Sequence, residues 1–345
     1  MVKTQGVQQR SRLRKAVVYT ESFTAGAMTR NDVKIVIVGR NGQLAWELQR
    51  VLASLGSVTS VGRPEFDLTN PDSVRATVRE LRPDILVNAA AYTAVDLAES
   101  EPEIAMKTNV EGPRELAEEA KKIGSLFITY SSDYVFDGKK ATSYTESDAP
   151  NPLNTYGASK LAGDRAVEDA GGAYLIFRTS WVYGARGKNF LNTILKLGSE
   201  REELRIVDDQ VGAPTWSREI AIATGQVVQN VLGTSGSASK YPAEKLGARR
   251  GIYNMTAGGR VSWHGFATAI LEEARKYAIS PKPVARIVAI PTSEYPTPAR
   301  RPKNSSLANE KLKEVFGASL GDWRDSVTKV IEQIAQQHDP IHQQR

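Results

Sequence analysis

The chain has 345 residues, of which 41% are hydrophobic and 24% charged, a composition typical of a soluble globular protein. It contains no cysteine, which excludes disulfides, a thiol nucleophile and a thiolate zinc site. The formal charge is +6, but most of the excess lies in residues 1–30, so the remainder carries no basic field for nucleic acid. No apolar run approaches the ~20 residues that span a membrane.

The basic segment 1–31 has neither the apolar core of a secretory signal nor a strand or helix pattern. We therefore expect a disordered leader on a cytoplasmic protein. The chain has only three histidines, His264, His338 and His342, and no G-x-S-x-G motif accompanies them. A serine hydrolase is thus disfavoured.

Short apolar segments alternate with helical patterns through the first half of the chain. The predicted strands are 33–38, 58–61, 85–87, 126–129 and 174–178. The predicted helices are 44–55, closed by Gly56, then 71–81 with Asn70 as its cap, and 104–123 divided near Gly112-Pro113. This alternation predicts an α/β fold with a doubly wound parallel sheet.

A glycine loop, residues 39–45, joins the first predicted strand to the first helix. Gly39 and Gly42 allow a tight turn in which backbone N–H groups approach a pyrophosphate at the helix N-terminus, and Ala45 replaces a third glycine. After the second strand we find no acidic residue to hold a ribose 2′-hydroxyl. Arg63 stands there instead, either to accept the 2′-phosphate of NADP or as an ordinary surface arginine.

Beyond residue 180 the alternation becomes irregular. Residues 233–239 and 291–302 have loop composition, and helices are predicted near 263–277 and 323–336. We expect a dinucleotide-binding domain at 32–180 and a partly interleaved, mainly substrate-binding lobe at 181–336 with some return to the sheet. A tail follows at 337–345.

Tyr156 and Lys160 form a Y-x-x-x-K pair. On a helix these positions share one face, so we expect the ammonium to lower the pKa of the phenol towards neutrality. The fourth strand leads into residues 130–134, Y-S-S-D-Y, which places hydroxyls at the sheet edge where such folds bind ligands. A hydroxyl donor at Ser132 beside this pair and a dinucleotide loop indicates carbonyl reduction.

With these motifs the chain resembles the extended short-chain dehydrogenase/reductase family over residues 33–323. The segments that carry the resemblance are 39–48, 88–100, 130–138, 154–163, 177–183, 207–215 and 295–305. The resemblance is closest to members that use NADPH or NADH to reduce the C4 ketone of a nucleotide-linked 4-keto-6-deoxy sugar. It implies a small-molecule substrate and no nucleic-acid or membrane partner.

The resemblance also implies roles for residues. Tyr156 would protonate the C4 oxygen, Lys160 would bind the nicotinamide ribose and tune Tyr156, and Ser132 takes a position that is often threonine. Gln43, Leu44, Asp67, Leu68, Ala90, Ala91, Thr93 and Tyr130 match the family's cofactor contacts, beside Tyr156 and Lys160. The glycine loop and the end of the second strand add Gly39, Asn41, Gly42 and Arg63 to the expected cofactor contacts. The implied substrate contacts are Ser132, Asp133, Tyr134 and Trp181, although the last two also suit core aromatics.

Some family members hold magnesium between glutamates at a dimer contact. Glu47 and Glu219 match two of these positions, but the third is Gln333. Both glutamates also suit ordinary solvated helix positions. The sequence therefore leaves open whether the protein binds magnesium and whether it forms a homodimer.

Two other functions compete with reduction. Sugar dehydratases and epimerases of this fold retain NAD, and the dehydratases place Asp-Glu directly after the strand-four hydroxyl, whereas here Ser132 is followed by Asp133 and Tyr134. A non-catalytic NADP-binding subunit, like the partner of methionine adenosyltransferase, would keep the cofactor loop alone. The joint presence of Ser132, Tyr156 and Lys160 favours a reductase.

Overall fold

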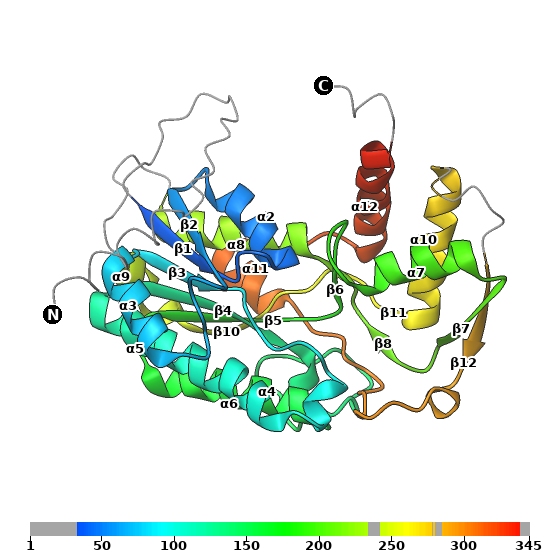
Figure 1. Ribbon diagram of the computed structural model, residues 1–345, viewed down its shortest axis with the longest axis horizontal. Helices are drawn as coiled ribbons and strands as arrows, with labels where there is room; N and C mark the ends of the chain where they lie inside the picture. Colours follow the sequence, from blue (N-terminus) through cyan, green and yellow to red (C-terminus); the bar gives the residue numbers. More distant parts are fainter. Residues whose placement is uncertain (1–32, 234–241, 278, 280–284, 339–345) are drawn as a thin grey trace, which may run out of the picture.

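The structure is a computed structural model and describes residues 33–233, 242–277, 279 and 285–338. The basic leader predicted at 1–31, most of the loop predicted at 233–239 and most of the tail predicted at 337–345 lie outside these residues. Two lobes are visible in Figure 1, one built around a large sheet and a smaller one at its right.

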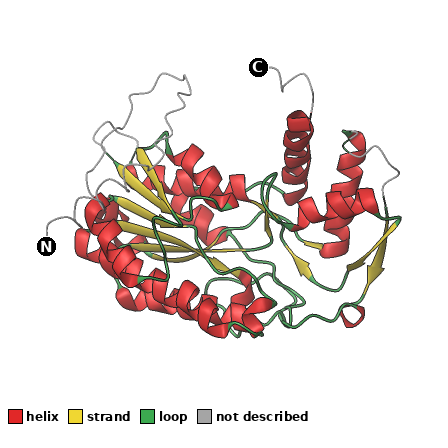
Figure 2. Cartoon of the chain, viewed as in Figure 1, coloured by secondary structure: helices red, strands yellow, loops and turns green. Residues whose placement is uncertain are grey.

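The larger lobe contains a six-stranded sheet with the order β10-β5-β4-β3-β1-β2, and every described strand pair in it is parallel. The strands are β1 (Lys34–Val38), β2 (Ser57–Val61), β3 (Ile85–Asn88), β4 (Leu126–Ser132), β5 (Tyr174–Thr179) and β10 (Gly251–Asn254). β4 is buried along its whole length, because helices cover both faces of the sheet. Figure 2 shows the strands in yellow between two layers of red helices.

Helices lie on both faces of the sheet, as the doubly wound prediction requires (Figure 1). One face carries α2 (Gln43–Leu52), α8 (Ser217–Leu232) and α11 (Glu310–Phe316), whose apolar side chains share a core with β1, β3, β4 and β5. The other face carries α3 (Pro71–Leu81), α5 (Gly112–Ile123) and α6 (Thr155–Ala170). The predicted fold class is confirmed.

The five strands predicted from apolar runs are confirmed to within a few residues, and so is the helix after Asn70, whose side chain accepts from the N–H groups of Asp72 and Ser73. Two helix predictions need correction. α2 ends at Leu52 rather than near Gly56. Gly56 serves another purpose: a Cβ there would lie 2.3 Å from the carbonyl oxygen of Val33, so only glycine lets the chain pass beside β1.

The helical segment predicted at 104–123 is continuous rather than divided at Gly112-Pro113. α4 (Pro102–Met106) runs into a π-helical turn at Lys107–Glu111, which runs directly into α5 at Gly112. Pro113 cannot donate an N–H to the preceding turn, and the wider π-helical turn stands directly before it. The proline therefore coincides with a local change of helix type and does not end the helix.

The smaller lobe has its own apolar core. It contains α7 (Phe190–Glu200), α10 (Trp263–Lys276), α12 (Trp323–His338) and the parallel pair β7 (Glu203–Val207) and β12 (Arg286–Ile290). Two further pairs join β6 (Val182–Tyr183) to β9 (Thr215–Trp216) and β8 (Val211–Gly212) to β11 (Val261–Ser262). The predicted helices near 263–277 and 323–336 are confirmed. Between the smaller lobe's elements the chain returns to the large sheet through α8, α9 (Pro242–Leu246) and β10.

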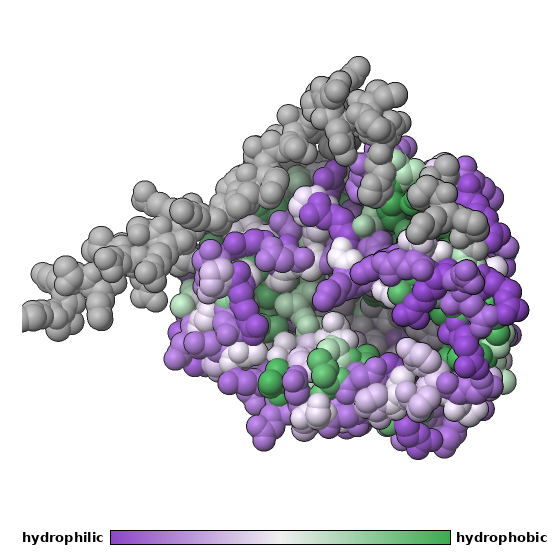
Figure 3. All heavy atoms as spheres, turned by 45° about the vertical axis from the view of Figure 1, so that its right-hand side comes forward, coloured by the Kyte–Doolittle hydropathy of each residue, from purple (hydrophilic) through white to green (hydrophobic). Residues whose placement is uncertain are grey.

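Hydrophilic residues dominate the face seen in Figure 3, with apolar residues in small separate areas. Within the described part of the chain, none of the helices has the length and apolar character that a membrane span requires.

Candidate active site

The glycine loop lies between β1 and α2, as predicted. Gly39 has a φ of 106°, and a Cβ there would lie 3.0 Å from the amide nitrogen of Ala90. Only glycine adopts this conformation and fits this space without strain. Gly42 precedes α2 and has no side chain that could cap it, so the first N–H groups of the helix lack a side-chain partner, as an anion site at a helix N-terminus requires.

Gln43 connects the loop to the smaller lobe. Its Nε2 donates to the carbonyl of Val182 over 3.3 Å, and its Oε1 accepts from Asn189 over 3.4 Å. Leu44 is buried under the sheet while Asn41 is exposed, so only one of these two predicted contacts presents its side chain to solvent.

The predicted contacts Ala90, Ala91 and Thr93 directly follow β3. Asn88, at the end of that strand, accepts from the N–H of Ala90 over 3.1 Å and fixes the turn. Because Gly39 packs on Ala90, these positions lie beside the glycine loop at the carboxyl end of the sheet, where ligands bind in this class of fold.

Arg63, Asp67 and Leu68 follow β2. The side chain of Arg63 is 72% exposed and its NH2 lies 3.5 Å from Oδ1 of Asp67. Hydrogen bonding from the Thr69 backbone, with Arg63 nearby, holds the pKa of Asp67 below its usual value. Leu68 is buried and would collide with a side chain at Gly112, so its own side chain is a packing group.

Tyr156 and Lys160 both lie on α6, as the spacing predicted. The helix begins at Thr155 and is capped by Asn154, whose Oδ1 accepts from the N–H of Gly157 over 2.7 Å. Gly157 has no room for a Cβ, which would lie 2.2 Å from the carbonyl oxygen of Tyr134, so this first turn packs directly on the segment after β4. Lys160 is buried, and its Nζ donates to the carbonyl of Tyr130 over 2.7 Å.

The expected lowering of the Tyr156 pKa by Lys160 is wrong for this structure. Burial raises the pKa of Tyr156 to about 12, and the nearby Ser132 hydroxyl offsets this only in part. The ammonium of Lys160 is directed at the Tyr130 carbonyl. Burial lowers the pKa of Lys160 in turn, against the attraction of Asp164 one helical turn further on.

Ser132, Asp133 and Tyr134 form a tight turn at the end of β4. The Ser132 hydroxyl donates to Oδ1 of Asp133 over 3.0 Å and accepts from the N–H of Tyr134. Asp133 is 2% exposed, and burial raises its pKa to about 7. Its Oδ2 has no hydrogen-bond partner among the described residues. The ring of Tyr134 meets Tyr156 edge to face at 5.7 Å, so the turn and α6 share one site.

The side chain of Tyr130, a predicted cofactor contact, is directed away from the site. The Tyr130 hydroxyl lies 2.8 Å from Oγ1 of Thr224 on α8, and burial raises the pKa of this tyrosine. Only the backbone of Tyr130 faces the site, through Lys160. Trp181 has a φ of 47° and stacks on Trp263 with ring centroids 3.5 Å apart, in the aromatic cluster of the smaller lobe.

The positions matched to magnesium ligands do not gather into a metal site among the described residues. Both carboxylate oxygens of Glu47 accept from Arg218, over 3.0 and 3.5 Å, and Glu219 lies 3.9 Å from the ammonium of Lys329. A cation bound there would have to displace these bases, and Gln333 supplies no charge. In the part of the chain that the structure describes, no three His, Cys, Asp or Glu side chains gather as metal ligands.

One buried ion pair behind the site escaped the sequence analysis. Arg178 on β5 donates from Nε to Oδ2 of Asp164 over 3.2 Å, and both side chains are at most 4% exposed. Asp164 stands four residues after Lys160, the same i, i+4 spacing that drew attention to Tyr156. That spacing is the signal that could have revealed it.

The dinucleotide loop at β1 and the Ser132, Tyr156 and Lys160 set at β4 together define a Rossmann-type reductase of the short-chain dehydrogenase/reductase class. Residues 33–336 match the family described as the RmlD substrate binding domain, and the chain belongs to that family.

Known relatives carry the similarity across nearly the whole described chain. It is 49% identical to the dTDP-4-dehydrorhamnose reductase of Burkholderia thailandensis over 306 residues, which cover 88% of this chain and 100% of the relative. It is 42% identical to the enzyme of that name from Escherichia coli K12, over 88% of this chain and 98% of the relative.

The chain is also similar in structure to solved enzymes of the same name. A dTDP-4-dehydrorhamnose reductase from Clostridium acetobutylicum superimposes with a TM-score of 0.78 at 34% identity, covering 88% of this chain and 99% of that one. The Bacillus anthracis enzyme in complex with NADP gives a TM-score of 0.76 at 32% identity, covering 87% and 99%.

Proposed function

We propose that this protein is a dTDP-4-dehydrorhamnose reductase, which uses NADPH or NADH to reduce the C4 ketone of dTDP-4-dehydro-L-rhamnose to dTDP-L-rhamnose. The observation that carries the proposal is the shared placement of Ser132, Tyr156 and Lys160 at the carboxyl end of the sheet that also bears the glycine loop. The names of the relatives supply the sugar and the nucleotide.

The nicotinamide would supply a hydride to C4 of the sugar. The chain's own part is to donate a proton to the C4 oxygen, and Tyr156 is the donor placed for it. A pKa of about 12 keeps this phenol protonated at physiological pH, which suits an acid that acts in the direction of reduction. The Ser132 hydroxyl, close enough to Tyr156 to influence its pKa, would turn from Asp133 to donate to the same oxygen and orient it.

Lys160 would stabilise the phenolate that Tyr156 becomes when it gives up its proton. Its ammonium is held by the Tyr130 carbonyl, and Asp164 keeps it charged despite burial. The same position would let it bind the ribose of the nicotinamide. Asp133, Tyr134 and, from the smaller lobe, Trp181 are the proposed sugar and nucleotide contacts.

The site favours reduction over dehydration. A dehydratase needs a base for the C5 proton after the strand-four acid, and Tyr134 occupies that position with a pKa raised by burial. A non-catalytic binding subunit would bind dinucleotide without turnover. Product analysis separates these functions.

The test supplies the purified protein with NADPH and dTDP-4-dehydro-L-rhamnose, made in place from dTDP-glucose by a dehydratase and an epimerase, and identifies the product. Tyr156→Phe should lower kcat by about 100-fold or more while cofactor binding survives, the usual scale for loss of a general acid. Tyr174→Phe is the matched control, since Tyr174 begins β5 at the opposite end of the strand. NADPH binding without any turnover would refute the proposal.

A further inference from the structure

We infer that Arg40 and Ser60 form the binding site for the 2′-phosphate of NADPH, and that Glu65 competes with this phosphate for Arg40. The inference rests on the proposed function, because it places a nicotinamide dinucleotide in the glycine loop. It replaces Arg63 with a different residue as the group that selects NADPH.

The position of Arg40 is the first argument. It follows Gly39 in the loop, its N–H donates to the carbonyl of Val61, and its side-chain Nε donates to the carbonyl of Ser60 over 3.2 Å. The guanidinium therefore lies across the carboxyl end of β2, where Rossmann folds place the adenine ribose. Gly62 permits this approach, because a Cβ there would lie 3.2 Å from the Cβ of Arg40.

Ser60 is the second and independent argument. It is 3% exposed, and its Oγ has no hydrogen-bond partner among the described residues. A buried hydroxyl without a partner costs stability unless a ligand satisfies it. Ser60 and Arg40 line the same cavity of about 510 Å³ at the N-terminus of α2.

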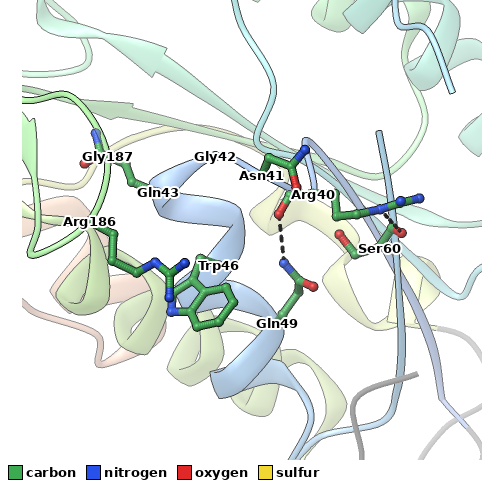
Figure 4. A pocket seen from close by; sticks show the side chains of 9 residues that line it. All are labelled: Arg40, Asn41, Gly42, Gln43, Trp46, Gln49, Ser60, Arg186 and Gly187. Carbon is green, nitrogen blue, oxygen red and sulfur yellow. Dashed lines mark hydrogen bonds between the residues drawn. The ribbon is translucent and has the colours of Figure 1, made fainter. Parts of the chain in front are cut away.

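Figure 4 shows how this cavity is arranged, with Arg40 and Ser60 on one side and Arg186 and Trp46 on the other. The guanidinium of Arg186 lies 3.8 Å from the ring centroid of Trp46. The described lining includes two arginines and no carboxylate, and the open N-terminus of α2 adds favourable potential for an anion. The cavity thus has the charge of a phosphate site.

Glu65 is the group that would compete with the 2′-phosphate for Arg40. Its Oε2 lies 3.3 Å from NH1 of Arg40, and the two side chains are 31% and 22% exposed. A carboxylate at this point accepts a ribose 2′-hydroxyl but repels a 2′-phosphate. With NADH, the Arg40–Glu65 pair would stay closed, whereas NADPH would take Arg40 from Glu65. Arg63 is a weaker candidate because it points to solvent and pairs with Asp67.

The test measures binding of 2′,5′-ADP and 5′-AMP to the full chain by titration calorimetry, since these probes differ only in the 2′-phosphate. Arg40→Gln should weaken 2′,5′-ADP by about tenfold or more, the effect of one lost charge-assisted hydrogen bond, and 5′-AMP by less than about threefold. Ser60→Ala should act in the same direction, more weakly. Glu65→Gln should tighten 2′,5′-ADP, and the NADPH-to-NADH ratio of kcat/KM should follow in each variant.

Two results would overturn the inference. One is an equal loss of both probes in Arg40→Gln, and the other is a selective loss in Arg63→Gln that Arg40→Gln does not show. The expected result for Glu65→Gln is a higher affinity for 2′,5′-ADP, and a misfolded variant cannot produce such a gain. If the unaltered protein bound neither probe, the dinucleotide site and with it the proposed function would fail, a result distinct from a wrong assignment of Arg40.

Discussion

Asp133 allows a test of the electrostatics of the site that does not depend on turnover. Burial raises the pKa of its carboxyl to about 7 from an ordinary value of 3.8, although the nearby hydroxyls of Ser305 and Ser132 oppose the rise. Asp133→Asn keeps the shape of the side chain and an oxygen that can accept from Ser132, but it removes the titration. Any pH-dependent difference between the two proteins therefore reports on this carboxyl.

The sign of the effect follows from which state ionises first. Below pH 3.8 the carboxyl is protonated in the folded and unfolded chains alike and costs nothing. Between pH 3.8 and 7 it ionises mainly in the unfolded chain, so the free energy of unfolding falls as pH rises. The cost reaches about 1.5 kcal/mol at pH 5 and about 4 kcal/mol at pH 8, since each pKa unit corresponds to about 1.4 kcal/mol.

The assay is urea unfolding of both proteins at pH 5 and pH 8. The stability of Asp133→Asn relative to the unaltered protein should increase by about 2–3 kcal/mol between the two pH values, whatever the constant difference between them. Asp169→Asn, which changes an exposed carboxylate near the end of α6, is the control for the general effect of removing a carboxylate. An equal difference at both pH values would mean that the Asp133 pKa is ordinary and its carboxylate is solvated.

Three further predictions concern other charges. Glu119→Gln should lower the free energy of unfolding at pH 7 by about 1–3 kcal/mol. Hydrogen bonding from Arg79 lowers the Glu119 pKa to about 2, so its contribution should be full above pH 4.5 and disappear towards pH 2 in unfolding curves. Lys160→Met should lower kcat by about 100-fold, because Lys160 stabilises the Tyr156 phenolate. It should also weaken the binding of NADPH in a fluorescence titration, because Lys160 also binds the nicotinamide ribose. Removing metal with a chelator should leave kcat unchanged, since Arg218 already neutralises Glu47; loss of activity restored by magnesium would contradict this.

The sheet could be predicted from the sequence because its signals are local. The apolar run of β1 and the Asn70-Pro71 start of α3 each occupy a few adjacent residues. β10 could not be predicted in the same way. It has four residues, begins with a glycine, and is a strand only because β5 lies beside it, more than 70 residues earlier in the chain.

In the site, too, features set by adjacent residues could be predicted, whereas contacts between distant residues could not. The spacing of Tyr156 and Lys160 predicted a shared helix face. It did not predict burial, and burial is what raises the pKa of Tyr156. Nor did it predict that Arg40 meets Glu65, since the two stand 25 residues apart and come together only through the turn after β2.

The chain returns to the large sheet after it has formed part of the smaller lobe, so no single truncation point yields one complete lobe. A fragment that stopped after β5 would lack β10 and α8, leaving one edge of β5 unpaired and the apolar side chains of α2 exposed to water. An unpaired edge of this kind recruits other strands, so such a fragment should aggregate rather than fold. Insertions and fusions would therefore be tolerated at surface loops, whereas circularly permuted or split versions must keep α8 and β10 with the sheet.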